Sequence, residues 1–142
     1  MDREIYTPPS GPPQGLSLSP EIYKVMGEEN IFKMLEDFYK VLETSSIRSM
    51  FPKDMMEGSK KSAAFFVGIC GGPPLYMERY GSPQMRSRHI RFPIDESARQ
   101  VWLDCFEKVL EKAAEKYQFP QQHLEAFRQF LVRFSAWMVN KA

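Results

Sequence analysis

Prolines divide most of this 142-residue chain into segments whose apolar residues recur with the period of an α-helix. Proline lacks a backbone N–H and holds the preceding residue extended, so it ends helices or occupies their first turn. Apolar residues between the prolines are three or four apart, and no segment alternates as a β-strand does. The sequence therefore predicts an all-α domain with about four main helices and two short ones. The dividing prolines are Pro20, Pro52, Pro73, Pro83, Pro93 and Pro120.

The periodic segments predict a short helix over residues 20–27 and longer helices over residues 31–42, 54–69, 96–117 and 121–138. Gly71-Gly72 ends the third of these segments, and the aromatic stretch after Pro73-Pro74 is expected to be irregular. The inward face of residues 54–69 is small and polar in its middle. Such a face leaves room for a group that is not a side chain, or it allows another helix to approach closely.

The composition is that of one ordinary globular domain with no overall attraction to nucleic acid or membranes. Hydrophobic residues make up 43% of the chain, and the net charge is +1. The sequence shows no leader peptide and no long apolar run, so the cytoplasm is the expected compartment. Cys70 and Cys105 form no Cys-x-x-Cys pair, which argues against structural zinc, a thioredoxin-type site and c-type haem. We expect both to be reduced thiols in the core.

The first 18 residues are expected to form a flexible extension before a helical domain over residues 19–142. The extension is rich in proline and glycine and has too little apolar surface to offset the entropy of ordering. Ile5 and Tyr6 could instead dock on the body of the protein or on a partner. Composition favours the disordered extension.

His89 stands out because arginines and apolar residues surround it, while Pro83 and Pro93 confine it to a short helix. A neutral imidazole can bind a metal through one nitrogen while the other donates to a backbone carbonyl, and guanidinium groups can pair with carboxylates. This combination suits a haem iron with its propionates, although a surface histidine in a basic turn explains the same residues. The other histidine, His123, has no such neighbours and is expected at the surface or a helix edge.

Several landmarks follow one another in a specific order along the chain. They are Phe38-Tyr39, Phe51-Pro52, Gly58-Ser59, Gly71-Gly72-Pro73, Tyr76, Arg86-x-Arg88-His89-x-x-Phe92 and Trp102-Leu103-x-Cys105. This order resembles the truncated, two-over-two haemoglobins of group II over residues 20–140. The resemblance implies a helical sandwich around a non-covalent haem b, with His89 as the proximal iron ligand.

The resemblance also implies roles for the other residues around the haem. Tyr39 and Trp102 would be distal hydrogen-bond donors to the bound gas, although two aromatics can also simply fill a helical core. The remaining pocket residues would be Phe51, Ser59, Ala63 and Phe66 on the distal side, Tyr76 and Arg88 near the propionates, and Met85, Phe92 and Ile94 on the proximal face.

The register of the distal helix is open by one residue between positions 58 and 67. Counting forward from Phe51-Pro52 makes Ser59 the distal residue, whereas counting back from Gly71-Gly72 makes it Gly58. Ser59 could donate its hydroxyl to a ligand or water, and Gly58 would leave an open gate.

Three functions are compatible with these features. The first is binding of O2 and other diatomic gases such as CO and NO by a monomer or homodimer. The second is a redox enzyme on the same scaffold, a nitric oxide dioxygenase or a peroxidase-like protein, which would need an external electron donor such as a reductase for sustained turnover. The third is a haem-free helical module whose basic patch, Arg86, Arg88 and Arg91, binds an acidic partner.

Overall fold

The computed structural model describes residues 3–14 and 18–142, and every regular element in this part of the chain is helical. The all-α prediction is therefore confirmed. The four long helices are α1 (Glu21–Glu43), α2 (Met55–Ile69), α5 (Glu96–Leu110) and α7 (Leu124–Met138). The short elements are η1 (Arg48–Met50), α3 (Leu75–Tyr80), α4 (Met85–His89), α6 (Ala113–Tyr117) and η2 (Gln121–His123).

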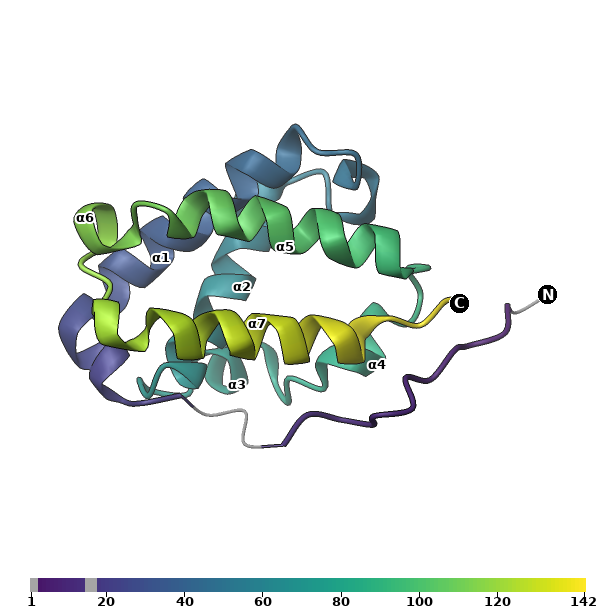
Figure 1. Cartoon of the computed structure of the whole chain (residues 1–142), viewed down its shortest axis with the longest axis horizontal. Helices are drawn as coiled ribbons and strands as arrows, with labels where there is room; N and C mark the ends of the chain where they lie inside the picture. The colour runs from purple at the N-terminus through teal and green to yellow at the C-terminus, as the bar shows by residue number, and fades with distance from the viewer. Residues whose placement is uncertain (1–2, 15–17) are drawn as a thin grey trace.

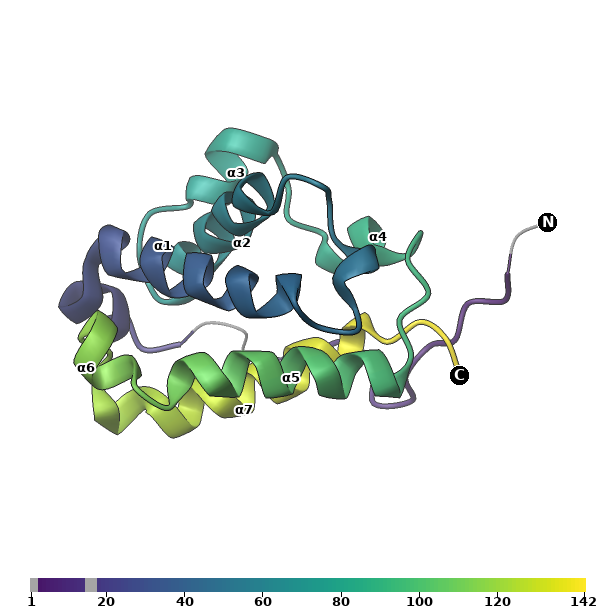
Figure 2. The same cartoon turned by 90° about the horizontal axis from the view of Figure 1, so that it is seen from above.

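The long helices form two layers, with α5 and α7 together in one of them (Figure 1). Figure 2 shows α1 and α2 on the opposite side. Buried phenylalanines join the layers, because Phe66 on α2 lies 5.7 Å from Phe106 on α5 and 5.8 Å from Phe127 on α7, measured between ring centroids. Burial of each such side chain stabilises the fold by roughly 1.5–3 kcal/mol relative to its exposure. This aromatic core fills one end of the sandwich.

Local sequence signals explain where the long helices begin and bend. Asp54 and Asp95 cap α2 and α5, accepting hydrogen bonds from the backbone N–H groups of Glu57 and Ala98 at 3.1 and 2.8 Å. Gly27 interrupts α1 with a φ of 79°, a conformation that favours glycine. The interruption separates the two helices that the sequence predicts on either side of Gly27.

Two segments differ from the prediction. Residues 75–80, expected to be irregular, form α3, because Pro73 and Pro74 supply its first carbonyl acceptors and Leu75 and Tyr76 are buried. The helix predicted to run to residue 117 breaks at Lys112, whose φ of −123° is not helical. The break lets the separate helix α6 pack its buried Tyr117 against α1.

The N-terminal extension contains no helix or strand over residues 3–14, as its composition predicts. Residues 1–2 and 15–17 of the predicted extension lie outside the described residues. The side chain of Arg3 and the backbone N–H of Tyr6 nevertheless form hydrogen bonds with the helical body, while the side chains of Ile5 and Tyr6, which the sequence offered for docking, are exposed. Figure 1 shows residues 3–14 running below the C-terminal end of α7.

Cys70 and Cys105 are both buried and free, as predicted. Burial raises the pKa of the Cys70 thiol to about 12, which keeps it protonated. Within residues 3–14 and 18–142, no helix is both long enough and apolar enough to cross a membrane.

Candidate functional site

A cavity of about 480 Å³ lies between the two layers, beyond the aromatic core. Its volume is typical of sites that hold a small organic molecule. Its walls come from the four long helices, from the segment between α1 and α2, from α4 and from the segments that flank α4. Most of the predicted pocket residues line it, namely Tyr39, Phe51, Phe66, Tyr76, Met85, Arg88, His89, Phe92, Ile94 and Trp102.

His89 is the last residue of α4, and its imidazole is held in a defined tautomer. The Nδ1 atom lies 2.6 Å from the carbonyl oxygen of Met85. A carbonyl oxygen only accepts hydrogen bonds, so Nδ1 carries the hydrogen and Nε2 carries the free lone pair of the neutral ring. Burial lowers the pKa of His89, and the positive charge of Arg91 lowers it further, while the bond to Met85 opposes both. The imidazole is therefore neutral at pH 7, the state in which it can bind a metal.

Tyr39 and Trp102 reach the cavity from different helices, and both pack against the ring of Phe38. Phe38 on α1 lies edge to face with Tyr39 at 5.7 Å and with Trp102 on α5 at 5.6 Å. Tyr39 also contacts Phe51 at a centroid separation of 5.6 Å. Burial raises the pKa of Tyr39 to about 12, and a hydrogen bond with Ser62 partly opposes the shift. The Tyr39 hydroxyl therefore keeps its proton at neutral pH, and the indole N–H of Trp102 is a donor at any pH.

The α2 helix presents Gly58 and Ser62 to the cavity. Ser59 instead donates its hydroxyl to the carbonyl oxygen of Met56 at 2.8 Å, and Ala63 is fully buried without lining the cavity. A Cβ atom at Gly58 would lie 2.9 Å from Cε2 of Tyr39, which shows how closely the helix approaches that ring. Ser59 and Ala63, predicted as pocket residues, therefore do not line the cavity, whereas Gly58 does, and the register of the distal helix stays a prediction.

Arg88, predicted to lie near the propionates, lines the cavity but also braces the loop before α4. It donates to the carbonyl oxygens of Pro83 at 2.7 Å and Ser82 at 2.8 Å. Two further cations also line the cavity, namely Lys61, which the sequence prediction missed, and Arg91, which it named only as part of the basic patch. Lys61 follows Gly58 by three residues, so the helical period could have placed it on the same face.

The sequence prediction also did not include the residues of α7 that line the cavity. Phe134, Ser135 and Met138 form part of the wall together with Arg99 of α5. Arg99 donates to the Ser135 hydroxyl at 3.0 Å and so connects α5 with α7. Phe134 and Met138 are four residues apart on an apolar helix face, and this spacing does not distinguish a cavity wall from a core.

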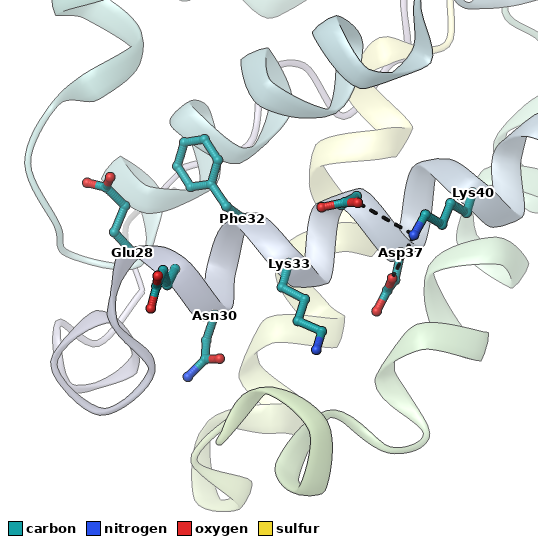
Figure 3. Close-up of a pocket in the computed structure, with 8 residues that line it drawn as sticks. Glu28, Asn30, Phe32, Lys33, Asp37 and Lys40 are labelled. Atoms are coloured by element: carbon teal, nitrogen blue, oxygen red, sulfur yellow. Dashed lines mark ion pairs between the residues drawn. The ribbon is translucent and has the colours of Figure 1, made fainter.

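A second hollow of about 560 Å³ lies on the outer face of α1 (Figure 3). Its side chains come from a single helix and pair with one another, since Lys40 lies 3.5 Å from Glu36 and 3.9 Å from Asp37. His123 lies away from both hollows and is half-buried, with its Nε2 atom 3.4 Å from Glu21 Oε1. Within the described residues, no group of three or more His, Cys, Asp and Glu side chains could hold a metal ion.

The chain is similar in sequence to known proteins over nearly all of its helical part. The family model of bacterial-like globins matches residues 21–138. Group 2 truncated hemoglobin YjbI of Bacillus subtilis (strain 168) is 34% identical over 90 residues, which are 63% of this chain and 68% of that protein. Two-on-two hemoglobin-3 of Arabidopsis thaliana is 28% identical over 98 residues, which are 66% of this chain and 56% of that protein.

Solved structures share the arrangement of helices. Phosphate-bound Hell's gate globin IV superposes with a TM-score of 0.82 at 37% identity, covering 91% of this chain and 80% of that chain. The truncated oxygen-avid haemoglobin from Bacillus subtilis gives a TM-score of 0.75 at 29% identity, covering 86% of this chain and 99% of that chain. The group II truncated hemoglobin from Bacillus anthracis gives a TM-score of 0.77 at 27% identity, covering 87% of this chain and 92% of that chain.

Proposed function

Because the chain belongs to the bacterial-like globin family, and within it to the group II truncated haemoglobins, we propose that it binds haem b around His89 and takes up oxygen and other diatomic gases there. The observation that carries this proposal is the state of His89. Its Nδ1–H group donates to Met85, so the basic Nε2 atom is free in a cavity with mainly aromatic and aliphatic walls. The similar protein from Bacillus subtilis is described as oxygen-avid, which favours oxygen as the gas.

The other side chains of the cavity also suit a haem. Phe66 and Phe92 offer apolar surface to a porphyrin, while Lys61 and Arg91 offer positive charge to its carboxylates. Members of the family hold haem b without a covalent bond, and neither cysteine of this chain lines the cavity. The residues present therefore fit a non-covalent haem.

Haem, when bound, supplies an iron with an open coordination position for a small gas molecule. His89 would hold the iron from α4, while Tyr39 and Trp102 would present O–H and N–H donors from α1 and α5. A hydrogen bond to a partly charged acceptor is worth roughly 1.5–3 kcal/mol. Phe51 and Phe66 add apolar walls that limit the access of water to these donors.

The spectrum of the purified protein tests this function. We expect a Soret band that changes on reduction and again when carbon monoxide is added, because His89 is the only lining residue that we assign to the iron. The absence of a Soret band after haem is supplied would contradict the proposal. It would favour the alternative that the chain is a haem-free helical module.

The raised pKa of Tyr39 gives a prediction for pH dependence. Since the phenol loses its proton only near pH 12, it remains a donor throughout the neutral and mildly alkaline range. We expect the oxygen dissociation rate to be constant within twofold between about pH 6 and pH 10. Stopped-flow measurements across this range check the prediction, and a steep rise in rate below pH 10 would show that the phenol ionises early.

The close approach of Gly58 to Tyr39 predicts that Gly58→Ala disturbs the site. The new methyl group would push the Tyr39 ring away from its position, because 2.9 Å is too short for two carbon atoms. We expect the oxygen dissociation rate to rise by about threefold to tenfold as the Tyr39 hydrogen bond weakens. Ser59→Ala is the matched control on the neighbouring residue and should leave the rate unchanged. The reverse pattern would support the register in which Ser59 faces the haem.

The redox functions would use the same cavity and stay predictions. Nitric oxide dioxygenation and peroxidase-like turnover both need a supply of electrons if they are to continue. Rapid mixing of nitric oxide with the reduced, oxygen-equilibrated protein, followed by nitrate analysis, separates the first activity from simple gas binding.

A further inference from the structure

Asn140 connects the end of α7 to the turn that follows His89. It is completely buried, and its side chain donates to the carbonyl oxygen of His89 at 3.3 Å. Its Oδ1 atom accepts from the backbone N–H of Ile94 at 3.1 Å, and its own backbone N–H donates to the carbonyl oxygen of Ile94 at 2.9 Å. The C-terminal segment therefore holds both ends of the turn over residues 89–94.

Arg3, from the other end of the chain, holds the same turn. One Nη atom donates to the carbonyl oxygen of Asn140 at 2.8 Å, and the other donates to Asn140 Oδ1 at 2.5 Å. The second Nη atom also reaches the carbonyl oxygens of Ile90 at 2.7 Å and Phe92 at 3.2 Å. A guanidinium group suits this position because its donors form a rigid planar fork that can serve several acceptors together.

Arg86 of α4 anchors the extension from the side of the proximal helix. It donates to the carbonyl oxygen of Tyr6 at 2.8 Å and to that of Val139 at 2.8 Å. Its guanidinium lies 4.5 Å from the ring of Trp137. The backbone N–H of Tyr6 completes the contact by donating to the carbonyl oxygen of Asn140 at 2.9 Å. The extension is thus fixed by hydrogen bonds at residues 3 and 6.

These contacts matter because α4 is only five residues long. A helix of this length cannot hold its own shape in water, and its last carbonyl groups have no partners within the helix. Asn140 and Arg3 supply partners to three of the carbonyls at and after its end, those of His89, Ile90 and Phe92. The direction of the His89 side chain depends on the backbone that these bonds fix.

We propose that Arg3 and Asn140 are positioning residues that form a proximal clamp and fix the orientation of His89 toward the haem. This inference rests on the proposed function, because it assigns the clamp an effect on the bond between His89 and the iron. It also gives the N-terminal extension a role in holding the cofactor, although the extension lies outside the helical sandwich.

The test compares Arg3→Ala with Arg128→Ala in the haem-loaded protein. Arg128 is the matched control, because it also makes side-chain hydrogen bonds, at 2.8 and 3.0 Å to Glu107, and lies away from the cavity. For Arg3→Ala we expect haem transfer to excess apomyoglobin to be about tenfold faster, which corresponds to one hydrogen bond of a charged group. We also expect a shifted or broadened iron–imidazole band in resonance Raman spectra, and faster amide exchange at Ile94. Arg128→Ala should match the wild type in all three.

Arg3→Lys provides a second variant that retains the positive charge but lacks the planar guanidinium group. Its rate of haem transfer should lie between those of the wild type and Arg3→Ala. An unchanged transfer rate and an unchanged Raman band in Arg3→Ala would overturn the clamp while leaving gas binding intact. Faster haem transfer with an unchanged Raman band would also overturn it, since that result indicates general loosening without a change at His89. If the wild type itself bound no haem, the proposed function would fail, and unaltered exchange at Ile94 would separately refute the clamp.

Discussion

His89→Gly is expected to abolish tight haem binding, and imidazole added to the solution is expected to restore it. The substitution removes the only side chain of the cavity that we assign to the iron and leaves a space beside the carbonyl oxygen of Met85. Free imidazole can occupy this space, because the same carbonyl can accept its N–H group as it now accepts that of His89. The measurement is the Soret absorbance that remains after gel filtration, with and without imidazole, in the reduced protein under carbon monoxide.

His123→Ala is the control, since His123 is the other histidine of the chain and lies beside Glu21. It should keep the full absorbance and need no imidazole. Loss of the haem from His123→Ala with retention in His89→Gly would reverse the assignment of the ligand. Retention in both variants would mean that the iron is held by another group.

Tyr39→Phe and Trp102→Phe are each expected to raise the oxygen dissociation rate by about tenfold to a hundredfold. Tyr39→Phe removes a single hydroxyl group, while Trp102→Phe removes the indole N–H and some of the ring that packs on Phe38. The effect of the double variant should differ from the sum of the two in free energy, because both donors serve one acceptor. Stopped-flow replacement of oxygen by carbon monoxide measures all three rates.

Tyr76→Phe is the matched control for the loss of a hydroxyl group. Tyr76 lines the cavity from α3 but lies under the Arg88 guanidinium, 5.3 Å from it, and not beside Tyr39. Its rate should remain within twofold of the wild type. If Tyr39→Phe and Trp102→Phe also remained within twofold, the two side chains would be aromatic filling and not hydrogen-bond donors.

The long helices were predictable from the sequence because their boundaries are determined by nearby residues. Proline and glycine set the breaks, and the aspartates before α2 and α5 cap the helices that follow. The break at Lys112 carries no such signal. Beyond the break Tyr117 is buried, and its hydroxyl donates to Asp37 at 2.5 Å, a contact between residues 80 positions apart. Contacts of this kind depend on the assembled fold.

The sequence predicted those site residues whose side-chain type has a distinctive chemistry. It was less successful for residues whose place in the site depends only on which face of a helix they occupy. His89, Tyr39 and Trp102 reach the cavity as the resemblance implies. Ser59 and Ala63 do not, because one residue along a helix is a rotation of about 100°, which turns a side chain from the cavity to the core. The proximal clamp was beyond prediction, since most acceptors of Arg3 are backbone carbonyl oxygens of residues 87 to 137 positions away, which have no signature in the sequence.

Resonance Raman spectroscopy of the reduced, ligand-free protein tests the central claim most directly, namely that Nε2 of His89 binds the iron. We predict an iron–imidazole stretching band that shifts when the protein is made with isotopically labelled histidine, persists in His123→Ala and disappears in His89→Gly. A haem-loaded protein that lacked this band, or one in which the band survived His89→Gly without added imidazole, would contradict the account.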